Sequence, residues 1–230
     1  MDTTVAMHIA NGIINGPVSL LFIAIAVAGL AVCVWRAKTD LDDRLAPMAG
    51  LVAAFIFAVQ MLNFQVLPGV SGHLLGGTLA VILVGPWVGA LCVATVLLVQ
   101  CLVFADGGLT AIGLNVTNMA LIGTAAAYLL VALLLRVLPR TPGGLGATAL
   151  IASIVGVVVA SQGFVVEYAL GGTTELSLGG IAATMAGVHV LIGIGEGLIA
   201  ATTVVTVAKV RPDLVYALRA FRTRSMGVKA

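Results

Sequence analysis

TLAVILVGPWVGALCVATVLLVQ, residues 78–100, is an apolar stretch without a charged residue, interrupted only by the Gly-Pro-Trp triplet at 85–87. An α-helix needs about 20 apolar residues to cross a hydrocarbon core of roughly 30 Å. Because proline lacks an N–H donor and clashes with the preceding helical turn, Pro86 is expected to interrupt the helix. The stretch therefore predicts either two membrane helices, the first of them short, or one long kinked helix.

Stretches of this kind recur along the whole chain. Of its 230 residues, 61% are hydrophobic and 9% are charged, whereas a soluble domain carries about 25% charged residues. The composition predicts an all-α fold, a polytopic transmembrane helical bundle. We expect spans near residues 17–35, 47–62, 73–84, 88–105, 113–136, 146–166 and 180–209. We interpret the chain as one integral membrane domain, residues 1–230, with an N-terminal extension at 1–6 and a basic cytoplasmic tail at 210–230.

The positive charges favour seven spans over six. With the N-terminus outside and the C-terminus in the cytoplasm, all eleven Lys and Arg residues lie in or beside cytoplasmic segments, as the positive-inside rule requires. Six spans would divide the basic clusters between the two faces of the membrane. Basic residues follow the first apolar run instead of preceding it, so this run is expected to remain as a span. The tail is interpreted as a helix on the membrane surface or as a docking site for a partner.

Several catalytic patterns are missing from the sequence. It has no G-x-x-x-x-G-K-[ST] loop, which excludes ATP hydrolysis by the usual P-loop route. It also has no nucleophile elbow and no acidic pair suited to acid/base catalysis. The cysteines lie in apolar runs without C-x-x-C spacing and are interpreted as small buried hydrophobic residues: Cys33, Cys92 and Cys101. We expect a transport component and not an enzyme, with no resident cofactor and no nucleic-acid partner.

Two of the three histidines, His8 and His73, are expected at the outer face of the bundle. Two imidazoles on one face are able to share a metal ion, although a hydrogen-bonded structural role is an open alternative. If Met7 were the first residue, its amine would join the amide and imidazole nitrogens of His8 in chelating one ion. A fourth nitrogen from His73 would complete a square-planar set, a geometry typical of Ni(II) or Cu(II) and possible for Co(II).

Polar side chains inside or beside the expected spans are further candidates. Amide pairs three residues apart share a helix face, where they either orient the histidines or form hydrogen bonds between helices. A histidine and a glutamate two turns apart in the last span form either a structural network or a functional site. These supporting candidates are Gln60 and Asn63, Asn115 and Asn118, and His189 and Glu196. The last pair raises an alternative function, a self-sufficient secondary transporter or channel with a His189/Glu196 proton relay.

Four stretches together resemble the CbiM/NikM membrane components of energy-coupling-factor transporters for cobalt and nickel. They are MHIANG at 7–12, AFIFAVQMLNFQVLPGVSGHLLGGTLAVILVGPW at 54–87, FADGGLTAIGLNVTNMA at 104–120 and HVLIGIGEGLI at 189–199. The resemblance implies that Met7, through its terminal amine, His8 and His73 hold the transported ion. It further implies an ABC-type ATPase dimer, a transmembrane coupling subunit and a small accessory membrane protein as partners.

The resemblance also implies a bacterial inner-membrane location and a supply of cobalt for cobalamin synthesis or of nickel for urease and hydrogenase. The sequence departs from the family pattern because residues 1–6 precede Met7 and would turn its amine into an amide. Such a nitrogen binds a metal only after losing a proton. Three explanations stay open: a different start, removal of the six residues, or a site with weaker ligands. Asn11 stands where the family usually has an acid. The choice between cobalt and nickel is left open.

Overall fold

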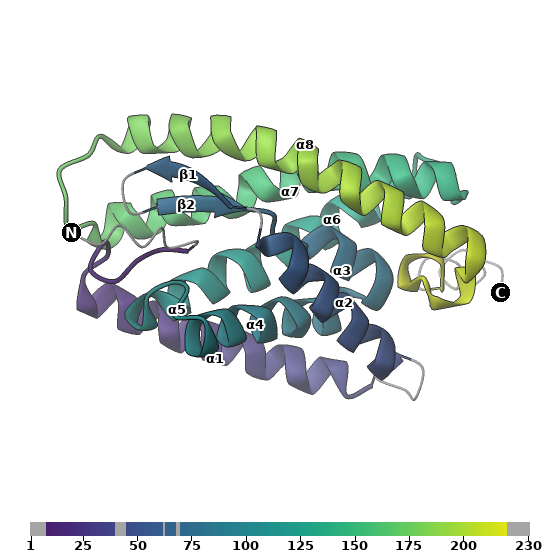
Figure 1. Cartoon of the computed structure of the whole chain (residues 1–230), viewed down its shortest axis with the longest axis horizontal. Coiled ribbons are helices and arrows are strands. Elements are labelled where there is room, and N and C mark those ends of the chain that lie inside the picture. The colour runs from purple at the N-terminus through teal and green to yellow at the C-terminus, as the bar shows by residue number, and fades with distance from the viewer. Residues whose placement is uncertain (1–7, 40–44, 62, 68–69, 220–230) are drawn as a thin grey trace, which may run out of the picture.

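The computed structural model describes residues 8–39, 45–61, 63–67 and 70–219, with the backbone alone at 63–67 and 70–71. Most helices run along the long axis of an elongated bundle (Figure 1). The elements are α1 (Gly16–Ala37), α2 (Leu45–Gln60), β1 (Asn63–Leu67), β2 (Val70–His73), α3 (Gly77–Val84), α4 (Pro86–Val103), the 3-10 turn Leu109–Ala111, α5 (Ile112–Asn115), the π-helix Val116–Gly123, α6 (Thr124–Leu134), α7 (Pro142–Gly171), α8 (Leu178–Val210) and the 3-10 turn Pro212–Leu214.

Five helical segments of the described chain are long and apolar enough to cross a membrane. They are Gly16–Ala37, Pro86–Val103, Leu109–Leu134, Pro142–Gly171 and Leu178–Val210. The prediction of a helical membrane protein is therefore confirmed. Helix α2 is also apolar but has only 16 residues, and α3 has only eight. The number of seven crossings and the orientation of the termini stay predictions.

The chain breaks at Gly85, between α3 and α4. Gly85 has φ +87°, a left-handed conformation that glycine adopts at little cost, and Pro86 starts the next helix. All eight residues of α3 are buried. A helix that is apolar on every side belongs in the core, so the short apolar run before the Gly-Pro-Trp triplet forms the centre of the bundle.

A two-stranded hairpin corrects the prediction of an all-α fold. Strands β1 and β2 pair antiparallel, with Asn63 opposite His73, and α3 begins at Gly77 and not at residue 73. The sequence contains the physical reason, because Pro68 and Gly69, a turn-forming pair, stand between the two short runs that pair. The hairpin lies in the segment between the expected spans 47–62 and 73–84, to which the sequence assigns no regular structure, and only His73 falls within an expected span.

Helix starts and close glycine contacts shape the rest of the bundle. The side chains of Asn15, Thr141 and Ser177 accept hydrogen bonds from the first turns of α1, α7 and α8, as N-cap residues do. Helices α7 and α8 approach closely at Gly193 and Gly197. A Cβ atom at these positions would come within 2.8 Å of Ile154 and 2.7 Å of Leu150, so only glycine allows α7 and α8 to pack this closely at these two positions.

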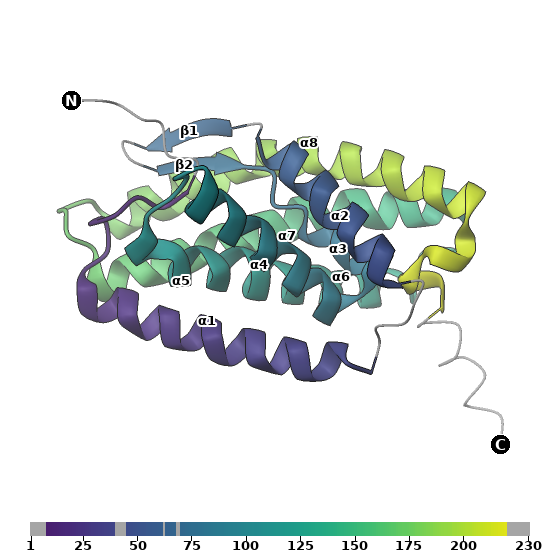
Figure 2. The same ribbon diagram turned by 60° about the horizontal axis from the view of Figure 1, so that its bottom comes forward.

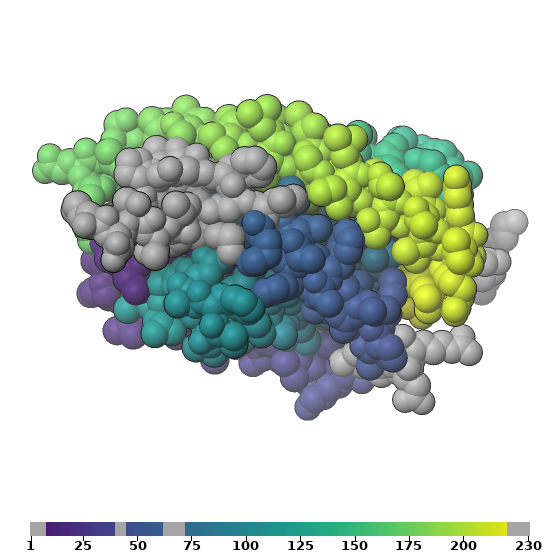
Figure 3. Space-filling model, viewed as in Figure 1, coloured from purple at the N-terminus to yellow at the C-terminus, as the bar shows by residue number. Residues whose placement is uncertain are grey.

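The two ends of the bundle differ in character. The segment from His8 to Asn15, the hairpin and the ends of α4 and α7 lie together at one end, whereas the last turns of α1 and α8 lie at the other (Figures 1 and 2). The last turns of α1 and α8 contain Arg36 and Lys209. Along the flank in Figure 3, α8 runs the length of the molecule and exposes Leu191 and Leu198, as expected of a lipid-facing helix.

Candidate metal centre

Residues 8–15 are fixed to the rest of the bundle by backbone and amide hydrogen bonds. The Ile9 N–H donates to Oδ1 of Asn115 at 3.2 Å, and the carbonyl of Ile9 accepts from the Gly108 N–H at 3.0 Å. At the other end of this segment, the Asn15 N–H donates to the Gly171 carbonyl at 2.7 Å. The segment therefore lies across the loop after α4 and reaches the end of α7.

A glycine allows His8 to approach this loop. Gly107 has φ +85°, and a Cβ atom there would come within 2.8 Å of the His8 Cβ. Any other residue would be both strained in its backbone and in collision with His8. The Asp-Gly-Gly sequence at 106–108 is thus suited to hold His8 against the loop.

His8 and His73 lie together. Their ring centroids are 4.5 Å apart, with an interplanar angle of 62°, and each residue is 4% exposed. Neither ring nitrogen of His8 forms a hydrogen bond with a described residue, and its Nδ1 lies 3.4 Å from Oδ1 of Asp106. Buried polar atoms normally have hydrogen-bond partners, so Nε2 of His8, which has no partner among the described residues, is the ring nitrogen available to a ligand, while Nδ1 faces Asp106.

His73 has a fixed orientation and a neutral ring. Its Nδ1 lies 2.8 Å from the carbonyl of Leu74, which assigns the hydrogen to Nδ1 and leaves the lone pair on Nε2. Burial, and then the neighbouring His8, lowers the pKa of His73 to about 3. The ring is consequently uncharged at neutral pH, the form in which imidazole binds a metal.

The chain after His73 is held from two helices. The Leu75 N–H donates to Oε2 of Glu196 on α8 at 2.6 Å, and the Gly76 N–H donates to the same oxygen at 3.1 Å. The carbonyl of Leu75 accepts a hydrogen bond of 2.9 Å from Nε2 of Gln60 on α2. All of these groups are buried, so the base of the hairpin has a defined position relative to the bundle.

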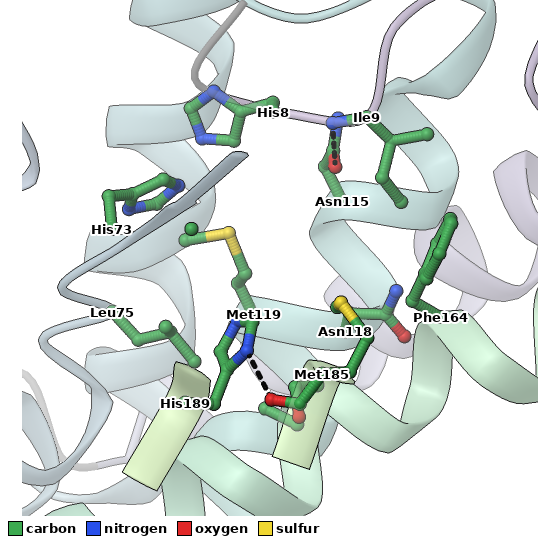
Figure 4. Close-up of a pocket in the computed structure, with 13 residues that line it drawn as sticks. His8, Ile9, His73, Leu75, Asn115, Asn118, Met119, Phe164, Met185 and His189 are labelled. Atoms are coloured by element: carbon green, nitrogen blue, oxygen red, sulfur yellow. Dashed lines mark hydrogen bonds between the residues drawn. The ribbon is translucent and has the colours of Figure 1, made fainter. Parts of the chain in front are cut away.

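A cavity of about 60 Å³ continues from the histidine pair into the bundle. It reaches the third histidine, His189 (Figure 4). Asn118 borders it and donates from Nδ2 to Oε2 of Glu167, a fully buried residue, at 2.8 Å. The lining comprises His8, Ile9, Gly72, His73, Leu75, Asn115, Asn118, Met119, Ala160, Ser161, Phe164, Met185 and His189.

Three buried carboxyl groups reach residues that line this cavity. Asp106 lies beside His8, Glu167 accepts a hydrogen bond from Asn118, and Glu196 accepts one from the backbone of Leu75. The cavity is therefore lined by histidine, amide, thioether and apolar side chains, and the three carboxyl groups lie one residue further out, in contact with residues of its wall.

The structure brings some of the predicted site residues together and separates others. His8, His73, Asn115, Asn118 and His189 line one cavity, and Gln60 and Glu196 support its wall. Met7 lies outside the described residues, as does the side chain of Asn63, whose backbone pairs with His73. His189 and Glu196 bind different backbone groups, since Nδ1 of His189 lies 2.7 Å from the carbonyl of Met185.

Sequence reasoning missed Asp106, Met119 and Met185 as residues of this region. The Asp-Gly-Gly triplet is a signal for Asp106, because two glycines after an acid mark a loop that allows close approach. No comparable signal exists for the methionines, which look like ordinary apolar residues. In the described part of the chain, no group of three or more His, Cys, Asp or Glu side chains is arranged to hold a metal ion.

Residues 8–214 match a family described as the cobalt uptake substrate-specific transmembrane region, CbiM. The chain is 38% identical over 209 residues to a protein of Archaeoglobus fulgidus that is provisionally named the fused nickel transport protein NikMN. This match covers 91% of the chain and 68% of the relative. A protein of Geobacter sulfurreducens named cobalt transport protein CbiM is 30% identical over 228 residues, covering 91% of the chain and 61% of that relative.

Solved structures share the fold. A crystal structure described as a transition metal transporter superimposes with a TM-score of 0.81 at 26% sequence identity, covering 95% of the chain and 99% of the solved chain. A structure described as a truncated transition metal transporter gives the same TM-score and identity, and covers 88% of the chain and 99% of the solved chain. The overall fold is therefore shared with proteins described as transition metal transporters.

Proposed function

The chain belongs to the CbiM family of cobalt uptake transmembrane regions, and we propose that it captures a divalent cobalt or nickel ion between His8 and His73. The observation that carries this proposal is the pair of buried imidazole rings whose centroids lie 4.5 Å apart. Imidazole nitrogen is a suitable ligand for both metals. The available Nε2 of His8 and the oriented, neutral ring of His73 support the assignment.

We further propose that Met7 and the backbone of His8 complete the coordination shell. The described residues contain no group of three or more His, Cys, Asp or Glu side chains that could hold the ion by itself, which is compatible with a contribution from backbone nitrogen. A free amine at Met7 would bind the ion near neutral pH, whereas an internal amide must first lose a proton. The affinity of a chain that starts at Met7 should therefore exceed that of the chain that starts at Met1, and the difference should narrow as the pH rises.

The captured ion enters the cell with the help of partner proteins in this proposal. The family resemblance supports the role of the substrate-specific component of an energy-coupling-factor transporter, which works with ATPase subunits, a transmembrane coupling subunit and a small accessory membrane protein. The metal site would face the outside of the cytoplasmic membrane. The basic residues at the opposite end of the bundle support this orientation, among them Arg36 and Lys209.

Metal content tests the proposed site. A chain that begins at Met7 is purified in detergent, and bound Ni(II) and Co(II) are measured for this chain and for two variants, His8→Ala and His73→Asn. Asparagine at position 73 retains a donor for the Leu74 carbonyl but lacks the second ring nitrogen. We expect each variant to lose most of the tightly bound metal while keeping its helical circular dichroism. Equal metal content in all three proteins would refute the site.

A further inference from the structure

The part of the cavity that lies away from His8 contains a third imidazole and two thioethers. His189, Met119 and Met185 are 6%, 8% and 4% exposed, and all three line the same cavity as His8 and His73. In Figure 4 the side chain of Met119 extends between the rings of His73 and His189. The cavity of about 60 Å³ exceeds the roughly 10–15 Å³ that one water molecule requires, so it has room for one ion beyond the histidine pair.

The hydrogen bond of His189 selects the nitrogen that faces a ligand. Because Nδ1 lies 2.7 Å from the carbonyl of Met185, a backbone acceptor, Nδ1 carries the hydrogen and Nε2 carries the lone pair. Histidines that bind metals commonly donate their other ring N–H to a carbonyl or carboxylate in this way. His73 shows the same arrangement with the carbonyl of Leu74. In both of these cavity-lining histidines, Nε2 is therefore available to bind a metal ion.

The two methionines add soft donors to this imidazole. Thioether sulfur and imidazole nitrogen both bind late first-row transition metals, whereas Mg²⁺ and Ca²⁺ prefer oxygen ligands. Neither donor carries a charge, so the three together should bind an ion weakly. An intermediate binding site on a translocation pathway has to bind weakly, because the transported ion must be able to leave the site as readily as it enters.

We propose that His189 Nε2 and the sulfur atoms of Met119 and Met185 form a second, inner binding site for a divalent late transition-metal ion. This inference rests on the proposed function, because the inner site receives the ion that the His8/His73 site releases. The carboxyl group of Glu167 lies one hydrogen bond away through Asn118, which borders the same cavity. The inner site uses no residue before His8 and is therefore independent of the start of the chain.

The test is the number of Co(II) ions that the full chain binds in lipid nanodiscs. Equilibrium dialysis against Co(II) alone gives the stoichiometry, and the visible absorption of bound Co(II) reports a change in ligands. We expect two ions per chain, the second with an affinity at least tenfold lower. His189→Asn and Met119→Leu should each remove the weaker ion and keep the tighter one. Met48→Leu is the matched control, because Met48 is a partly buried methionine on α2 outside the cavity, and it should keep both ions.

The outcomes separate the two proposals. Binding of a single ion that His73→Asn removes would overturn the inner site and leave the proposed function intact. Two ions that persist in His189→Asn and Met119→Leu would overturn the inner site as well. If His189→Asn and Met119→Leu lose only the weaker ion and His73→Asn loses the tighter ion, the results would support both the inner site and the His8/His73 site. Binding that responds to His189→Asn but not to His73→Asn would support the inner site and contradict the proposed function.

Discussion

Glu196 on α8 fixes the backbone of Leu75, 121 positions earlier in the chain, through a hydrogen bond of 2.6 Å from the Leu75 N–H to Oε2. The same oxygen accepts the Gly76 N–H, and Gln60 binds the Leu75 carbonyl from the other side. Glu196 thus holds the segment that follows His73. A buried glutamate with two backbone donors has a structural explanation that does not require a proton relay with His189.

Glu196→Gln and Glu196→Leu should separate these two roles. Glutamine retains an acceptor oxygen, so we expect Co(II) affinity within about threefold of the unaltered protein. Leucine leaves two buried N–H groups without an acceptor, at a cost of about 1–3 kcal/mol each, and should weaken Co(II) binding at least tenfold. Equilibrium dialysis measures both affinities. Uptake into liposomes by this protein alone, driven by a pH gradient and abolished by Glu196→Gln, would instead establish the relay.

Gly107→Ala should displace His8 from the metal site. The new Cβ would lie 2.8 Å from the His8 Cβ, and Gly107 already has φ +85°. The matched control is Gly12→Ala, because Gly12 has the same φ of +85° but nothing within 4 Å of the added atom. Both variants place an alanine in the left-handed backbone conformation, which destabilises the fold by about 1–2 kcal/mol. Only Gly107→Ala adds the collision with His8. We expect it to weaken Ni(II) binding at least tenfold more than the control, measured by isothermal titration calorimetry.

Asn11→Asp should preserve the site, whereas Asn11→Ala should weaken it. Oδ1 of Asn11 accepts hydrogen bonds from the backbone N–H and the hydroxyl of Thr110, at 3.0 and 2.7 Å, and aspartate offers the same acceptor. Losing the acceptor is expected to cost about 1 kcal/mol, or roughly fivefold in Ni(II) affinity. Thr110→Val combined with Asn11→Ala should cost less than the sum of the single variants, because the two residues share one interaction. Additive effects would count against this contact.

Asp106→Asn should weaken Co(II) binding about tenfold through the loss of a buried negative charge beside His8. Charges in a medium of low dielectric constant act strongly on an adjacent ion, whereas exposed charges are screened by salt. Glu175→Gln makes the same change at an exposed residue in the connection between α7 and α8 and should alter the affinity less than twofold. Equal effects of both variants at 0.15 M salt would show that Asp106 acts only through the general surface charge.

The class of the protein and the positions of most of its helices follow from local patterns in its amino-acid sequence. Long apolar stretches and the break at Gly85-Pro86-Trp87 are local signals, because helix formation and its interruption depend on neighbours within a turn or two. The same local logic assigns no regular structure to residues 63–72, which form a hairpin that ends at His73. The sequence also identified His8 and His73 as candidate metal ligands, because both lie in stretches that resemble a known family.

Only the tertiary structure decided which residues meet. That Asp106 lies beside His8, that Glu196 and Gln60 hold Leu75, and that His189 shares a cavity with the histidine pair are contacts between distant parts of the chain. No local pattern specifies them, because they depend on how the helices pack around α3. Met119 and Met185 illustrate the reason most directly: the same apolar side chain faces lipid, core or cavity according to its neighbours, and only packing assigns these two to the cavity wall.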